Sequence, residues 1–158
     1  MRLRSAAIIL TTLLPLSLVI GCASAEKRSY EVVIKNDTHH DCLVWLTKDG
    51  PPYEPGWKAP EELAIERPRD AGEMIGGAVI KSGQTLGTNP MTGTFAPKTN
   101  AVLRVYSGAP KFNELLAIGP DSRERKHVLL APGLNTLVIH DDADGFRVER
   151  SVEHAPAK

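Results

Sequence analysis

The sequence lacks an excess of basic charge. It carries 19 lysine and arginine residues against 19 aspartate and glutamate residues. Two of the arginines, Arg2 and Arg4, lie in the N-terminal leader, so the rest of the chain is slightly acidic. Because no surplus of positive charge remains to pair with phosphates, we expect no nucleic-acid partner.

Cysteine is almost absent. There are two, Cys22 and Cys42, and Cys22 lies at the end of the leader, so no disulfide framework is available to the body of the protein. A single thiol in an exported protein could be reactive. Residues 42–47 (CLVWLT) are instead apolar on both faces, which favours Cys42 as a buried, small apolar side chain.

Known catalytic signatures are missing as well. The chain has no G-x-S-x-G elbow, no H-E-x-x-H helix and no glycine-rich phosphate loop with its lysine. Carboxylates are plentiful, but no pair is marked as facing each other. We therefore predict no catalytic residue and no cofactor, and keep a hydrolase with an unrecognised site as an alternative.

Long hydrophobic runs are limited to residues 6–20, an uncharged stretch that follows Arg2 and Arg4. A basic start followed by an apolar run of this length is typical of a secretory signal peptide. A transmembrane helix needs roughly 20 apolar residues, and Pro15 interrupts this shorter run. The leader therefore predicts export, with a retained transmembrane helix as the less favoured interpretation.

The leader ends in Val19-Ile20-Gly21-Cys22. This segment resembles the lipobox of bacterial lipoproteins, which has an aliphatic residue three places before the cysteine and a small residue just before it. The resemblance implies that residues 1–21 are a signal peptide cleaved after Gly21, and that Cys22 carries the lipid. Residues 22–29 would then form a short tether to the membrane, and the protein would face the periplasm or the cell surface.

A second cleavage site competes with the lipobox. Ala23-Ser24-Ala25 fits the A-x-A pattern of ordinary signal peptidase. Cleavage there would release a soluble periplasmic or secreted protein that begins at Glu26.

The body, residues 30–151, predicts an all-β fold. Tyr30, Val32 and Ile34 alternate with polar residues, which is typical of a half-buried strand. We expect strands at residues 30–35, 42–47, 78–80, 84–88, 92–96, 101–106, 112–118, 125–130, 134–140 and 146–150. The first two and the last two are expected to form hairpins.

Strands at this spacing predict an antiparallel, immunoglobulin-like β-sandwich. The likeness to immunoglobulin domains is architectural, because the Cys…Trp…Cys spacing of antibody domains is missing. Residues 152–158 read as a polar C-terminal tail.

One long proline-rich loop, residues 49–72, interrupts the pattern, and a short helix is expected to begin at Pro60. Tyr53 and Trp57 in this loop are candidates for stacking on a sugar ring or gripping a peptide. The alternative is that Trp57 folds back to cover a sheet edge or the core.

A metal site is the remaining candidate. His39, His40, His140 and Asp142 lie in or beside two predicted turns, and imidazole and carboxylate groups are ligands for zinc or copper. Strict alternation of the strands would bring both turns to the same end of the sandwich. The alternative is that these residues are simply polar turn formers.

We therefore predict an exported, lipid-anchored envelope protein of binding or structural type, with a carbohydrate or a protein as partner. A metal-binding accessory protein that uses the His/Asp turns and a hydrolase remain the alternatives.

Overall fold

The computed structural model describes residues 24–66 and 77–151. The predicted signal peptide, Cys22 and the predicted C-terminal tail lie outside the described residues. In chain order the elements are β1 (Glu26–Asp37), β2 (Cys42–Lys48), the 3-10 helix η1 (Pro55–Trp57), α1 (Pro60–Glu66), β3 (Ala78–Ile80), β4 (Thr85–Gly87), β5 (Met91–Phe95), β6 (Ala101–Ser107), α2 (Phe112–Ala117), β7 (Arg125–Leu129), β8 (Gly133–Asp142) and β9 (Gly145–Arg150). No helix among these is long and apolar enough to cross a bilayer.

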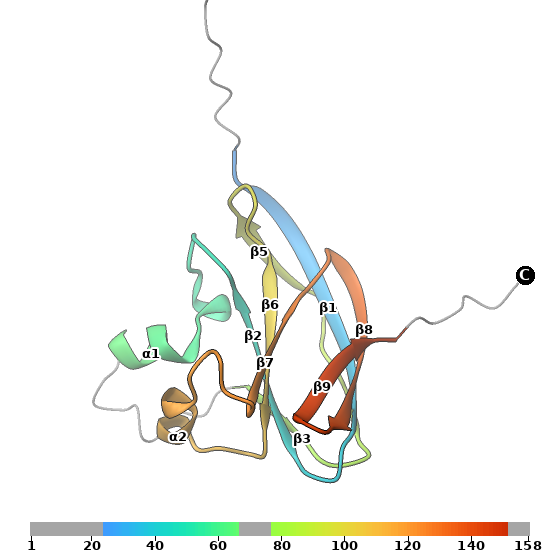
Figure 1. The fold of residues 1–158 in the computed structure, drawn as a ribbon. Helices are drawn as coiled ribbons and strands as arrows, with labels where there is room; N and C mark the ends of the chain where they lie inside the picture. Colours follow the sequence, from blue (N-terminus) through green and yellow to red (C-terminus); the bar gives the residue numbers. More distant parts are fainter. Residues whose placement is uncertain (1–23, 67–76, 152–158) are drawn as a thin grey trace, which may run out of the picture.

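The strands form two sheets, which confirms the all-β prediction (Figure 1). One sheet has the order β4-β1-β8-β9, with β5 also pairing with β1, and the other has the order β3-β2-β6-β7. The sheets are not wholly antiparallel as expected, because β1 and β8 run parallel from Tyr30↔Gly133 to Asp37↔His140. Every other strand pair within the described residues is antiparallel.

The predicted hairpin of the first two strands is wrong. β1 and β2 belong to different sheets, and the turn between them crosses from one sheet to the other. Because β2 is apolar on both faces, it takes a central place where one face meets the opposite sheet and the other is covered by helices. The predicted hairpin of β8 and β9 is confirmed.

β1 also begins earlier than predicted. Residues 26–29, expected to be tether, pair with β5, from Glu26↔Phe95 to Ser29↔Thr92. The tether predicted at residues 22–29 therefore does not include residues 26–29, which belong to β1.

Residues 112–118 were expected to form a strand and instead contain helix α2. The carboxylate of Glu114 accepts a hydrogen bond from the Lys111 backbone N–H at 2.8 Å and caps the first turn. Phe112 and Leu115, three residues apart, are both buried and so lie on one helix face. A strand would place these two apolar side chains on opposite faces, whereas a helix buries both of them.

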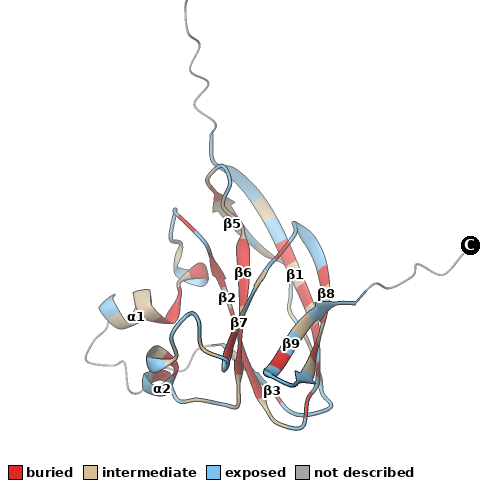
Figure 2. Ribbon diagram, viewed as in Figure 1, coloured by how far each residue is buried: buried red, intermediate tan, exposed pale blue. Residues whose placement is uncertain are grey.

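Two apolar clusters stabilise the body, and buried residues follow the middle of β1, β2, β6 and β8 (Figure 2). The first lies between the sheets and includes Tyr30, Val32, Ile34, Val44, Leu103, Val105, Leu137 and Ile139. The second lies on the outer face of the β2–β6 sheet, where Leu43, Trp45 and Tyr106 pack with Phe112 and Leu115 of α2. The helices therefore form a partial third layer.

Candidate functional site

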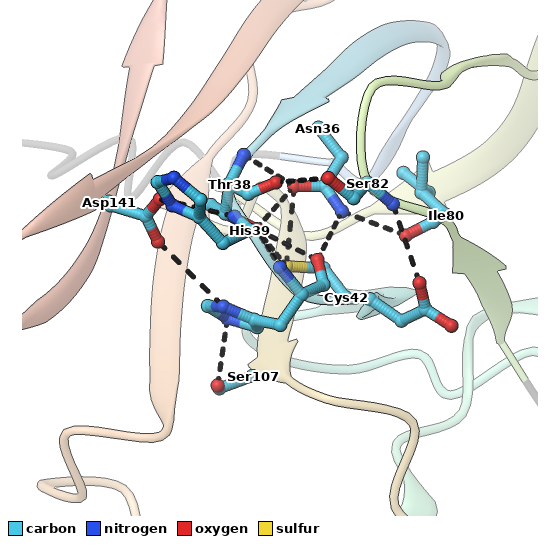
Figure 3. A network of polar contacts seen from close by, with 10 residues as sticks. Asn36, Thr38, His39, Cys42, Ile80, Ser82, Ser107 and Asp141 are labelled. Atoms are coloured by element: carbon cyan, nitrogen blue, oxygen red, sulfur yellow. Dashed lines mark hydrogen bonds and ion pairs between the residues drawn. The ribbon is translucent and has the colours of Figure 1, made fainter.

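The two His/Asp turns lie at the same end of the sandwich, although the strict strand alternation from which this was expected does not hold, because residues 112–117 form a helix and both β4 and β5 run antiparallel to β1. The β1–β2 turn, residues 38–41, follows the end of β1, and Asp141 is near the end of β8, which runs parallel to β1. Hydrogen bonds from His39 to Asp141 join the two segments directly (Figure 3). We call this the histidine end of the molecule.

Asn36 holds the histidine end together. Its side chain is buried, and its amide nitrogen donates to the carbonyls of His40 at 2.8 Å and Ile80 at 2.9 Å. Its amide oxygen accepts from the backbone N–H and the hydroxyl of Thr38 at 3.1 and 2.7 Å. Since all of these groups would lose partners without Asn36, the turn has a fixed shape.

His40 and His39 both face the carboxylate of Asp141. The His39 backbone N–H donates to Asp141 Oδ2 at 3.1 Å, and the His39 ring contacts the same oxygen. The Nδ1 atom of His40 lies 3.7 Å from Asp141 Oδ1, and its Nε2 atom lies 2.9 Å from the hydroxyl of Ser107 (Figure 3). Ser107, His40 and Asp141 thus form a continuous line of polar contacts.

The predicted metal set is not assembled. His140 lies 4.0 Å from Glu149 on the neighbouring strand, and Asp142 accepts a hydrogen bond from Ala143 within its own turn. Neighbouring residues of a strand point to opposite faces, so His140 points away from the side on which Asp141 meets the other histidines. Across residues 24–66 and 77–151, no group of three His, Cys, Asp or Glu side chains is arranged to hold a metal ion.

The lone thiol is buried, as predicted. Cys42 is fully inaccessible, and burial raises the pKa of its thiol, with a smaller opposing effect from its contact with the Thr38 hydroxyl. A protonated and inaccessible sulfur is a poor nucleophile.

The exposed binding role considered for Trp57 is wrong. Its side chain is only 2% exposed, and its ring packs edge-on against Tyr30 and Phe95 at centroid distances of 5.8 and 5.3 Å. Trp57 thus folds back onto the core, which is the alternative that the sequence left open. Tyr53, by contrast, is 52% exposed.

A buried lysine fastens the same loop. The Lys48 ammonium donates to the carbonyls of Pro52 at 3.0 Å and Thr94 at 2.6 Å, and pairs with Glu54. The hydrogen bond from Lys48 holds the pKa of Glu54 below its ordinary value, with a further contribution from the Thr94 backbone N–H. Residues 52–57 are therefore held against the sheets and do not form a free binding arm.

Ser107 is the residue that the sequence interpretation missed. It is the last residue of β6, half-buried, and precedes Gly108, whose φ of +76° turns the chain away from the sheet. It also lies on the wall of an open pocket of about 780 Å³. No local motif marks it, because His40 is distant in sequence and meets it only through the fold.

No protein-family model matches the chain, and no curated protein matches it. Among solved structures, the structure of pneumolysin resembles it with a TM-score of 0.30 and 14% sequence identity over 81% of this chain. The chain spans about a quarter of that protein (24%). A resemblance at this level carries no functional conclusion.

Proposed function

We propose that the protein is an exported, lipid-anchored envelope protein of binding type, with acyl chains on Cys22 and an immunoglobulin-like sandwich as its body. The observation that carries this proposal is the lipobox, Val19-Ile20-Gly21-Cys22, at the end of the leader. Only residues 23–25 separate Cys22 from Glu26, the first residue of β1. A lipidated cysteine there would hold the body close against the bilayer.

β1 then sets the orientation of the body. The strand runs from Glu26, beside β5, to Asp37, beside the histidine end (Figure 1). Its twelve residues are separated by steps of about 3.3 Å, so the strand spans roughly 36 Å from the first Cα to the last. The histidine end would therefore face away from the membrane, where a carbohydrate or protein partner in the envelope could reach it.

Stable attachment to the membrane through Cys22 requires more than one acyl chain. Each buried CH₂ contributes about 0.8 kcal/mol, so a single acyl chain binds a membrane marginally, whereas two or three hold it stably. A diacylglyceryl group on Cys22 meets this requirement.

Fatty-acid labelling of cells that produce the full precursor tests the proposal. We expect label on the wild type and on Cys42→Ala, and none on Cys22→Ala. Cys42→Ala is the matched control, because it removes the chain's other cysteine. Absence of label from the wild type, or label that survives Cys22→Ala, would refute lipidation at this residue.

A further inference from the structure

We propose that Ser107 is a nucleophile that hydrolyses small, uncharged carboxylic esters, with His40 as its general base and Asp141 as the residue that positions His40. The inference goes beyond the proposed binding function and does not depend on the lipid anchor. It rests on the way in which three segments, the β1–β2 turn and the ends of β6 and β8, meet at the histidine end (Figure 3).

The geometry satisfies the first requirement of a base-activated nucleophile. A serine hydroxyl is a weak nucleophile until a base within hydrogen-bond distance accepts its proton, and the base itself needs orientation by a third group. Ser107 Oγ lies 2.9 Å from His40 Nε2. With the imidazole proton on Nδ1, that nitrogen faces Asp141 Oδ1 at 3.7 Å.

The surrounding structure holds these groups in place. The carbonyl of His40 accepts hydrogen bonds from Asn36 at 2.8 Å and from the Thr38 hydroxyl at 2.9 Å. The backbone N–H of Ser107 donates to the Glu124 carbonyl at 2.9 Å. Both reacting residues therefore have fixed backbones, which is the preorganisation that catalysis by positioning requires.

The pocket beside Ser107 indicates the substrate class. At about 780 Å³ its volume is within the range of small-molecule sites. Gly108, Ala109, Pro110 and Ile118 provide apolar walls, and the acidic residues Glu114 and Glu124 also line the pocket. Negative charge at the wall disfavours anionic substrates, so a short-chain, uncharged ester fits this pocket best.

Ester hydrolysis at this site needs only Ser107, His40 and water. Ser107 Oγ attacks the ester carbonyl carbon while its proton passes to His40 Nε2. The C–O bond to the alcohol then breaks, and His40 returns the proton to the departing alkoxide. Water hydrolyses the acyl-serine in the same way, giving up a proton to His40 that restores the Ser107 hydroxyl, and the products are one alcohol and one carboxylic acid.

The test uses the purified mature protein with p-nitrophenyl butyrate as substrate and a fluorophosphonate as covalent probe. General-base catalysis contributes about 10²- to 10⁴-fold, so we expect hydrolysis above buffer that falls at least tenfold in Ser107→Ala and His40→Ala. Ser82→Ala is the matched control, because Ser82 lies at the same end but donates its hydroxyl proton to the Thr38 carbonyl. Because that bond holds the turn that carries His40, Ser82→Ala should lower the rate less than Ser107→Ala does.

Asp141 needs a separate readout, because it acts through His40. We expect Asp141→Asn to lower kcat with KM unchanged, and Asp141→Glu to recover part of kcat. A purely structural role would instead lower the folded fraction in both variants.

The covalent probe is applied to the wild-type protein, so its result does not depend on whether the alanine variants fold. Phosphonylation of wild-type Ser107, mapped by peptide mass spectrometry, would support the proposal. Folded wild-type protein that neither hydrolyses the ester above buffer nor carries the probe on Ser107 would overturn it.

Discussion

Asn36 and Lys48 are buried polar side chains placed at opposite ends of the sandwich, and each ties a loop to the sheets. Asn36 forms hydrogen bonds with backbone groups of the turn that carries the histidines, and Lys48 donates hydrogen bonds to backbone carbonyls of the proline-rich loop and of β5. Neither role could be predicted from the sequence, because each partner set comes from segments that only the fold brings together. An isolated buried polar group costs about 1–3 kcal/mol, so both residues specify where their loops dock.

The ion pair of Lys48 with Glu54 predicts part of the acid sensitivity of the protein. A carboxylate whose pKa is lowered by folding stabilises the folded state at pH values above its ordinary pKa of about 4.3, and this stabilisation is lost as the pH falls through the lower, folded value. We expect the free energy of unfolding to fall less steeply between about pH 5 and pH 2 in Glu54→Gln than in the wild type.

Urea unfolding at several pH values measures this slope. Glu31→Gln is the control, since the Glu31 carboxylate makes no hydrogen bond or ion pair with the rest of the described chain. Equal slopes in Glu54→Gln and the wild type would contradict the assignment.

Among the elements, strands could be predicted where alternation or a strong apolar run marks them. β1, β2, β6, β8 and β9 are of this kind, and the hairpin of β8 and β9 follows from its Asp-Gly turn. The sheet to which each strand belongs could not be predicted, because the parallel pairing of β1 with β8 joins segments about a hundred residues apart. α2 was missed since its six residues are too few for a helical period to stand out.

Two glycines of the same sheet, Gly93 in β5 and Gly87 in β4, are expected to differ sharply in how much an alanine substitution destabilises the protein. A Cβ atom on Gly93 would lie 2.6 Å from Trp57 Nε1 and 3.0 Å from Glu54 Oε2, whereas one on Gly87 would meet nothing within 4 Å. We expect Gly93→Ala to lower the free energy of unfolding by about 1–3 kcal/mol, the usual cost of overpacking. Gly87→Ala should change it by less than about 1 kcal/mol.

Chemical denaturation of both variants measures the difference. Equal stability of Gly93→Ala and Gly87→Ala would show that Trp57 does not pack against β5 as described.

At the scale of the whole molecule, the sequence predicts the location of the protein and the structure describes its candidate site. The leader predicts the compartment and the lipid, but residues 1–21 and Cys22 lie outside the described residues. The structure places the two His/Asp turns at one end, where contacts form with Asp141 and Ser107, and no metal-ligand set forms within the described residues. Ser107 could not be predicted from the sequence, because it lies in β6 and its partners His40 and Asp141 come from a distant turn and from β8.

The intact mass of the mature protein, recovered from the membrane fraction, tests the central claim most directly. We predict a polypeptide that begins at Cys22 and whose mass is increased by a diacylglyceryl group, with or without a further acyl chain. A lipid-free polypeptide that begins at Glu26 and is found in the aqueous fraction would contradict it.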